Sequence, residues 1–223
     1  MQIQEKTIDI YPSESKSAPL VLLNSYQPCG GALLQKCRAL GCPGFTLAEI
    51  TRLHWDDELS PWACPPIREE APFGGRADDY LDCLLHDILP AVTAALGAEP
   101  QAVMLEGYSM AGLFALYAAT KCDRFQAVAS CSGSLWFPSF KEYMLSCDTA
   151  TLPKVIYLSL GDREACTRHP LLQTTEDATR AIERHLAANG IRTTFELNKG
   201  NHFHQSTLRM AKGIQWMLEQ RLQ

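Results

Sequence analysis

The sequence lacks the segments that would anchor a protein in a membrane or direct it out of the cell. It contains no stretch of 18 apolar residues, so no helix is expected to span a bilayer. The first ten residues, MQIQEKTIDI, have no apolar core of the kind found in a secretion signal. We therefore expect a cytoplasmic protein with no membrane partner.

Metal and disulfide patterns are also missing. The nine cysteines are odd in number, form no Cys-x-x-Cys pair and are not joined by histidines at zinc-finger spacing. In a cytoplasmic protein such cysteines are expected to be reduced thiols, most of them small apolar core residues. The sequence thus predicts neither a metal site nor a disulfide framework.

Strong charge of either sign is absent. The 25 acidic and 20 basic residues leave a net charge of −5, and no run of like charges occurs. Nucleic acids and anionic membranes are bound by positive patches that release counterions, so neither is expected as a partner. The sequence also has no internal repeats or low-complexity linkers.

What is present is enough for one sizeable core. A chain of 223 residues with 46% hydrophobic residues fits a single domain, 1–223, without metals or disulfides to support it. Whether that domain forms a homo-oligomer is left open by the sequence.

Strand-like and helix-like segments alternate along the chain, which is typical of a mostly parallel sheet with helices on both faces. The run Leu20–Asn24 is continuously apolar, as expected for a strand buried on both faces. Strands are predicted at 7–11, 20–24, 44–50, 102–106, 127–131, 154–160 and 193–197, and helices at 32–40, 78–98, 113–119, 174–189 and 205–222.

One segment, Thr51–Arg76, interrupts this alternation. It is too long for an ordinary connection and contains two tryptophans and four prolines. Loops of this length are often functional, although a surface loop held by prolines is the simpler alternative.

The chemistry is indicated by Gly107-Tyr-Ser109-Met-Ala111, a Gly-x-Ser-x-Gly pattern with alanine in the last position. In this pattern the serine lies on a sharp turn between a strand and a helix, which exposes its hydroxyl. The context fits, because a predicted strand ends at Glu106 and an apolar helix follows Met110. Ser109 is therefore the candidate nucleophile, and a structural serine at an ordinary helix start is the alternative.

A serine nucleophile needs a general base, which in this type of fold follows the last strand. The segment after strand 193–197 contains His202 and His204. We favour His202, which directly follows a Gly-Asn turn, over His204, which is closer to the start of the final helix.

The acid that orients the histidine should follow an earlier strand. Strand 154–160 ends in Gly161-Asp162-Arg-Glu164, so two carboxylates are available. In this loop the acid commonly falls three residues after the glycine, which favours Glu164 and leaves Asp162 as the alternative. Cys131, which has no histidine in prospect, is a poor candidate for a second nucleophile.

An oxyanion hole requires two backbone N–H groups. One is expected from Met110, the residue after the nucleophile. The other should come from the turn Asn24-Ser-Tyr26 after the first central strand, and Tyr26 is the best candidate by position.

These residues together resemble the α/β-hydrolase superfamily, and within it the small esterases related to esterase D and enterochelin esterase. The matching motifs are GYSMAGL at 107–113, SGSLW at 132–136, SLGDRE at 159–164 and GNH at 200–202, in a resemblance that covers about residue 20 to the C-terminus. The resemblance implies a carboxylic-ester hydrolase that uses Ser109, Glu164 and His202 and needs no cofactor.

The resemblance also implies an open substrate pocket. Only about twenty residues separate strand 127–131 from strand 154–160, too few for a separate cap domain. We expect Trp136 and the loop from Trp55 to Trp62 to form the pocket walls, which suits a small acyl, aryl or sugar-bearing ester. Two other functions use the same motifs: acyl transfer or thioester cleavage by the same serine, and a binding protein that kept the fold but lost activity.

Overall fold

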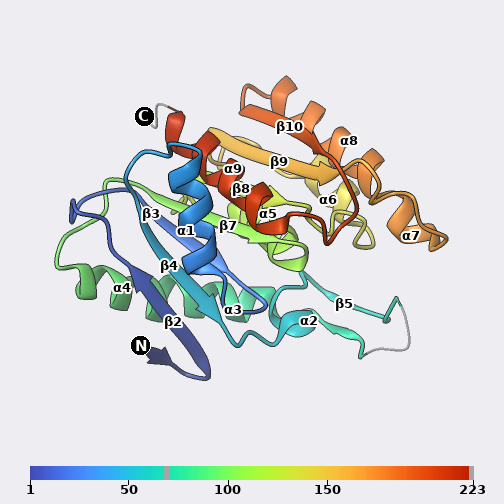
Figure 1. Cartoon of the computed structure of the whole chain (residues 1–223). Coiled ribbons are helices and arrows are strands. Elements are labelled where there is room, and N and C mark those ends of the chain that lie inside the picture. Colours follow the sequence, from blue (N-terminus) through green and yellow to red (C-terminus); the bar gives the residue numbers. More distant parts are fainter. Residues whose placement is uncertain (68–70, 221–223) are drawn as a thin grey trace.

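The computed structural model describes residues 1–67 and 71–220 (Figure 1). In this part of the chain, eight strands form one sheet in the order β1-β2-β4-β3-β7-β8-β9-β10. The first two pairings, β1 with β2 and β2 with β4, are antiparallel, and all others are parallel. The strands are β1 (Gln2–Ile3), β2 (Lys6–Tyr11), β3 (Leu20–Asn24), β4 (Thr46–Thr51), β7 (Val103–Tyr108), β8 (Ala127–Cys131), β9 (Val155–Gly161) and β10 (Arg192–Asn198), with β5 (Ala63–Cys64) and β6 (Phe73–Gly74) in a separate hairpin.

Helices cover both faces of the sheet, as predicted. In Figure 1, α1 and α9 lie on the near face, and they also contact each other. Side chains of β3 alternate between the two cores: Leu20 and Leu22 pack with α3, α5 and α8, whereas Val21 and Leu23 pack with α1 and α9. The helices are α1 (Gly30–Ala39), α2 (Trp55–Glu58), α3 (Ala77–Cys83), α4 (Leu89–Leu96), α5 (Met110–Lys121), α6 (Phe140–Ser146), α7 (Pro170–Gln173), α8 (Thr175–Ala188) and α9 (Ser206–Glu219).

The predicted helix 78–98 is present but interrupted. Between α3 and α4 lies a π-helical turn, η1 (Leu84–Ile88), in which the Leu89 N–H donates to the Leu84 carbonyl five residues back. Pro90 follows immediately and has no N–H to give to an ordinary helical turn. A π-helix occurs mostly as a single turn within an α-helix, and here that turn lies just before the proline.

The segment 51–76 contains short elements that its sequence did not predict. They are α2 and the β5–β6 hairpin, and residues 68–70 of the segment lie outside the described part. The last predicted helix likewise extends to residue 222, of which 221–222 are outside the described part. Within the described residues, no helix is both long enough and apolar enough to cross a membrane.

Candidate active site

The candidate residues gather at the carboxyl ends of the parallel strands. After β3 the chain adds β4 on one side of β3, and it then crosses back to add β7 on the other side. The strand order therefore reverses direction between the neighbouring strands β3 and β7. Ligands of open α/β sheets bind at such a switch point. Asn24 and Gly107 are register partners there, which places the turn after β3 beside Ser109.

Ser109 sits on a strained turn between β7 and α5. Its φ of 61° and ψ of −124° are unusual for a residue with a side chain. The turn is tight enough that a Cβ at Gly107 would lie 2.2 Å from the Ala111 carbonyl oxygen and 2.6 Å from the Ala111 Cβ. The glycine is therefore required at 107, whereas the space it leaves admits alanine at 111.

Three predicted residues form one hydrogen-bonded chain. Ser109 Oγ lies 3.0 Å from His202 Nε2, and His202 Nδ1 lies 2.7 Å from Glu164 Oε2. The alternatives are placed elsewhere: the Asp162 carboxylate is exposed and accepts the Gly200 N–H at 2.8 Å. His204 is also exposed, with its side chain packed against the backbone of Gly200.

Glu164 is held as a carboxylate. Its side chain is 5% exposed. Burial raises the pKa of Glu164, but hydrogen bonds from His202, the Gly161 N–H and the Ser132 hydroxyl outweigh it, so that the pKa lies below its usual value. An ionised acid accepts the Nδ1 proton of His202 and leaves Nε2 as the acceptor for the Ser109 hydroxyl.

The oxyanion candidates border the same space. Met110 is the first residue of α5, so its N–H has no acceptor within the helix. Tyr26 lies in the turn after β3, and its N–H donates to no acceptor among the described residues. Both residues line the cleft that contains Ser109 and His202.

That cleft has a volume of about 1030 Å³ and aromatic walls. Trp55 and Trp136 line it, as expected, and Tyr26 packs edge-on against Trp55 with ring centroids 5.3 Å apart. The prediction for Trp62 was wrong. Its indole N–H donates to the Pro138 carbonyl at 3.1 Å and its ring packs on three aromatic side chains from 137 to 143, so it supports the wall from behind.

A family model matches residues 54–206, which include Ser109, Glu164 and His202. The family is described as "Putative esterase". The chain belongs to this esterase family. The protein is accordingly a hydrolase that acts on esters. No curated protein sequence matches the chain.

Solved structures show the fold of this esterase to be the α/β-hydrolase fold. Siderophore hydrolase EstA from Aspergillus nidulans superimposes with a TM-score of 0.76 at 19% identity, over 96% of this chain and 89% of that one. An IroE-like serine hydrolase from Shewanella oneidensis gives 0.72 at 18%, over 96% and 76%. The enterobactin esterase FES from Shigella flexneri gives 0.70 at 20%, over 94% of this chain and 54% of that one.

A buried arginine, which was not among the predicted site residues, supports the candidate catalytic acid of the esterase. Arg209, on α9, is 1% exposed and donates to Glu164 Oε1 at 2.6 Å. It also donates to the Ser132 and Tyr108 hydroxyls and to the carbonyls of Lys199 and Asn201. Arg209 thus joins the acid to the loop that carries His202. The sequence does contain a sign of this role. Arg209 lies four residues before Gly213 and eight before Met217, so it falls on the buried face of the closing helix, where a charged residue is unusual.

Cys131, the poor candidate for a second nucleophile, lies outside the cleft. The Cys131 thiol is fully buried on the α9 side of the sheet, where it bonds Glu106 Oε1 at 3.3 Å and burial raises its pKa well above the usual value. All nine cysteines are free.

Among residues 1–67 and 71–220, no three His, Cys, Asp or Glu side chains are grouped as a metal ion would require.

Proposed function

We propose that the protein is a serine esterase that forms an acyl-enzyme on Ser109, with His202 as general base and Glu164 as the orienting acid. The observation that carries the proposal is the chain from Ser109 Oγ through the His202 imidazole to Glu164, with spacings of 3.0 and 2.7 Å. These spacings are within hydrogen-bond reach for proton transfer.

In the first half of the reaction, His202 Nε2 takes the hydroxyl proton as Ser109 Oγ attacks the ester carbonyl. The oxygen that gains negative charge is held by the N–H groups of Met110 and Tyr26. Collapse of this intermediate breaks the ester C–O bond, and the leaving alcohol takes the proton back from His202.

In the second half, water replaces the alcohol. His202 removes a proton from the water, the hydroxide adds to the acyl carbon, and Ser109 leaves with the proton returned by His202. Throughout, the Glu164 carboxylate stabilises the imidazolium and stays ionised, in keeping with its lowered pKa.

The substrate we propose is a small acyl, aryl or sugar-bearing ester. The cleft is open to solvent and bordered by Tyr26, Trp55 and Trp136, whose rings suit flat or cyclic groups. Of the similar structures, EstA is a siderophore hydrolase by name and FES is an enterobactin esterase. Faster hydrolysis of long-chain than of acetyl esters would contradict this choice.

The mechanism is tested by intact-mass labelling with a fluorophosphonate on wild type, Ser109→Ala and His202→Ala. We expect one adduct on wild type, none on Ser109→Ala and slow labelling of His202→Ala. A folded wild type that takes no adduct would contradict the acyl-enzyme and favour a binding protein with this fold. An adduct with no ester hydrolysis, but product formation with added alcohol, amine or thiol acceptors, would favour acyl transfer instead.

A further inference from the structure

The turn that carries Tyr26 is tied at both ends to the neighbouring strand β4. At its start, the Ser25 N–H donates to the Ile50 carbonyl at 2.9 Å. At its end, the N–H groups of Cys29 and Gly30 donate to the two carboxylate oxygens of Glu49 at 2.7 and 2.9 Å. Adjacent residues of one strand therefore fix both ends of a four-residue turn, 25–28, whose members all line the cleft.

Glu49 is an unusual residue for this position. It is 0% exposed in a strand whose six residues are all buried. A buried carboxylate is costly unless hydrogen bonds satisfy it, and here two backbone N–H groups at the start of α1 do so.

Gly30 is fitted to this carboxylate. A Cβ at Gly30 would lie 2.7 Å from Glu49 Oε2 and 2.5 Å from Tyr11 Cε2. At the next residue, Gly31, a Cβ would meet nothing within 4 Å. Close approach of the carboxylate thus requires glycine at 30 and does not require it at 31.

We propose that Glu49 is a positioning residue for catalysis, which clamps the turn 25–28 so that the Tyr26 N–H is fixed as an oxyanion donor. The inference rests on the proposed function, because it assigns a supporting residue to the same reaction. Glu49 does not touch the substrate; it acts through the backbone of the turn.

The clamp should matter more in the transition state than in the bound substrate. Negative charge on the oxygen develops only as Ser109 attacks, so a loosened donor lowers kcat with little effect on KM. Removal of one oxyanion donor outright costs about 10²–10³-fold in kcat. A donor that is loosened rather than removed should cost about 10-fold or more.

The experiment compares Glu49→Gln with Glu106→Gln, the same substitution at a fully buried glutamate of β7. In Glu49→Gln, the new side chain would keep one acceptor oxygen and turn an amide group toward the other N–H. In contrast, burial raises the pKa of Glu106 well above its usual value, so its uncharged form resembles glutamine. For Glu49→Gln we expect kcat to fall at least 10-fold and KM to change less than about threefold. A boronic acid that mimics the tetrahedral intermediate should bind more weakly, and its dissociation constant should rise in proportion to the fall in kcat. Glu106→Gln should keep the wild-type kcat.

A second pair of variants covers the case in which Glu49→Gln does not fold. Gly30→Ala pushes the carboxylate from its two N–H partners and should reproduce the loss of kcat, while Gly31→Ala should not. A wild type that cleaves no ester would contradict the proposed function itself. An active wild type with unchanged kcat in folded Glu49→Gln or in Gly30→Ala, or with a change confined to KM, would overturn the clamp alone.

Discussion

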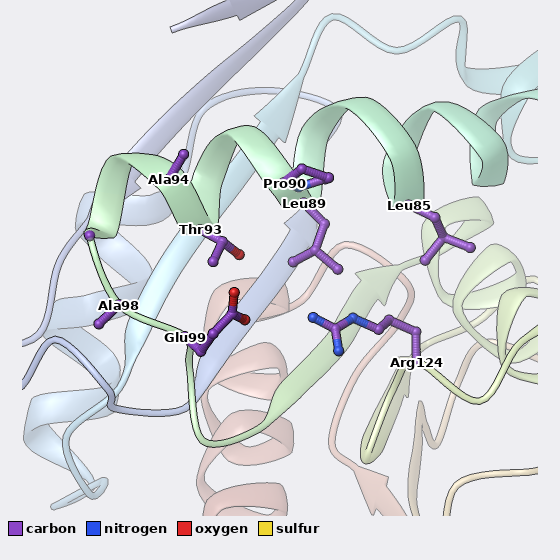
Figure 2. Close-up of a pocket in the computed structure, with 9 residues that line it drawn as sticks. Leu85, Leu89, Pro90, Thr93, Ala94, Ala98, Glu99 and Arg124 are labelled. Carbon is purple, nitrogen blue, oxygen red and sulfur yellow. The ribbon is translucent and has the colours of Figure 1, made fainter.

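Two of the hollows among the described residues lie at opposite ends of the sheet, and one of these two contains a hydrogen-bonded set of candidate catalytic side chains. The cleft at Ser109 lies at the carboxyl ends of the strands. The other hollow, of about 580 Å³, lies beneath α4, and its lining residues Glu99 and Arg124 come just before β7 and β8 (Figure 2). It is therefore at the amino ends of the same strands.

The two hollows differ in how their polar groups are held. At the cleft, Ser109, His202 and Glu164 are hydrogen-bonded in series, and Arg209 fixes the last of them from behind. In the hollow, Figure 2 shows Glu99 and Arg124 extending into the space beneath α4, but no hydrogen bond joins their side chains to other described residues. Volume alone does not make a site; side chains positioned by buried partners do.

The largest loss of activity is expected when Glu164, the acid of the Ser109 cleft, is changed. Glu164→Gln leaves the shape of the site but removes the charge that holds the His202 tautomer, and should lower kcat by about 10³–10⁴-fold. Asp162→Asn, at the residue directly after the same strand, should leave kcat nearly unchanged, because its exposed side chain keeps an oxygen for the Gly200 N–H. Steady-state kinetics of both variants measure the two kcat values. A larger loss of kcat in Asp162→Asn than in Glu164→Gln would show that Asp162, and not Glu164, is the acid.

The sequence was sufficient to predict that Ser109, Glu164 and His202 lie together, because each follows a strand in a short local motif. Strands buried on both faces are recognisable as apolar runs, and a parallel sheet brings their carboxyl ends to one edge whatever the details of packing. β3 and β8 accordingly have the predicted bounds, 20–24 and 127–131, and the other predicted strands differ by one or two residues at their ends.

Residues whose roles depend on contacts between distant segments could not be predicted in this way. Arg209 meets Glu164 across 45 positions, and only the placement of α9 over the sheet brings them together. Trp62 was expected in the pocket because it is aromatic and lies in a long loop, but the packing of α6 decides which way its ring faces. The π-helical turn before Pro90 was not predicted either, because a proline without an N–H can be accommodated in a helix in more than one way.

A smaller effect, with a dependence on pH, is expected from Arg209→Met. Loss of the cation beside Glu164 should raise the pKa of that carboxyl and cost stability, since breaking a buried ion pair costs about 3–5 kcal/mol. The pKa of folded Glu164 is lowered, so its ionised form stabilises the protein above the pKa of the unfolded state, about 4.3, and that stability is lost as the pH falls through the lower, folded value. In Arg209→Met the folded pKa of Glu164 moves up toward the unfolded value, so the stability lost on acidification should be smaller, and the loss should be complete at a higher pH.

Thermal unfolding of Arg209→Met between neutral and acidic pH measures this shift, and kcat at neutral pH should fall by about 10²-fold because the His202 loop is no longer fixed. Arg180→Met is the matched control, since Arg180 pairs with Glu176 on the surface of α8, where an ion pair contributes about 0–1 kcal/mol. Equal acid sensitivity in the two variants would show that Arg209 does not hold the Glu164 charge.

The smallest effect is expected in the opposite hollow. Arg124→Ala removes the one cation among the described residues that line it, and Glu99→Gln neutralises its carboxylate. Neither side chain has a hydrogen-bonded partner among the described residues to leave unsatisfied, so each change should alter the free energy of unfolding by less than about 0.5 kcal/mol and leave kcat and KM at their wild-type values. Chemical denaturation and steady-state kinetics measure both. A loss of activity in Arg124→Ala would break the contrast, because it would mean that the amino-end hollow communicates with Ser109 through β7 and β8, and the two ends of the sheet would have to be treated as one functional unit.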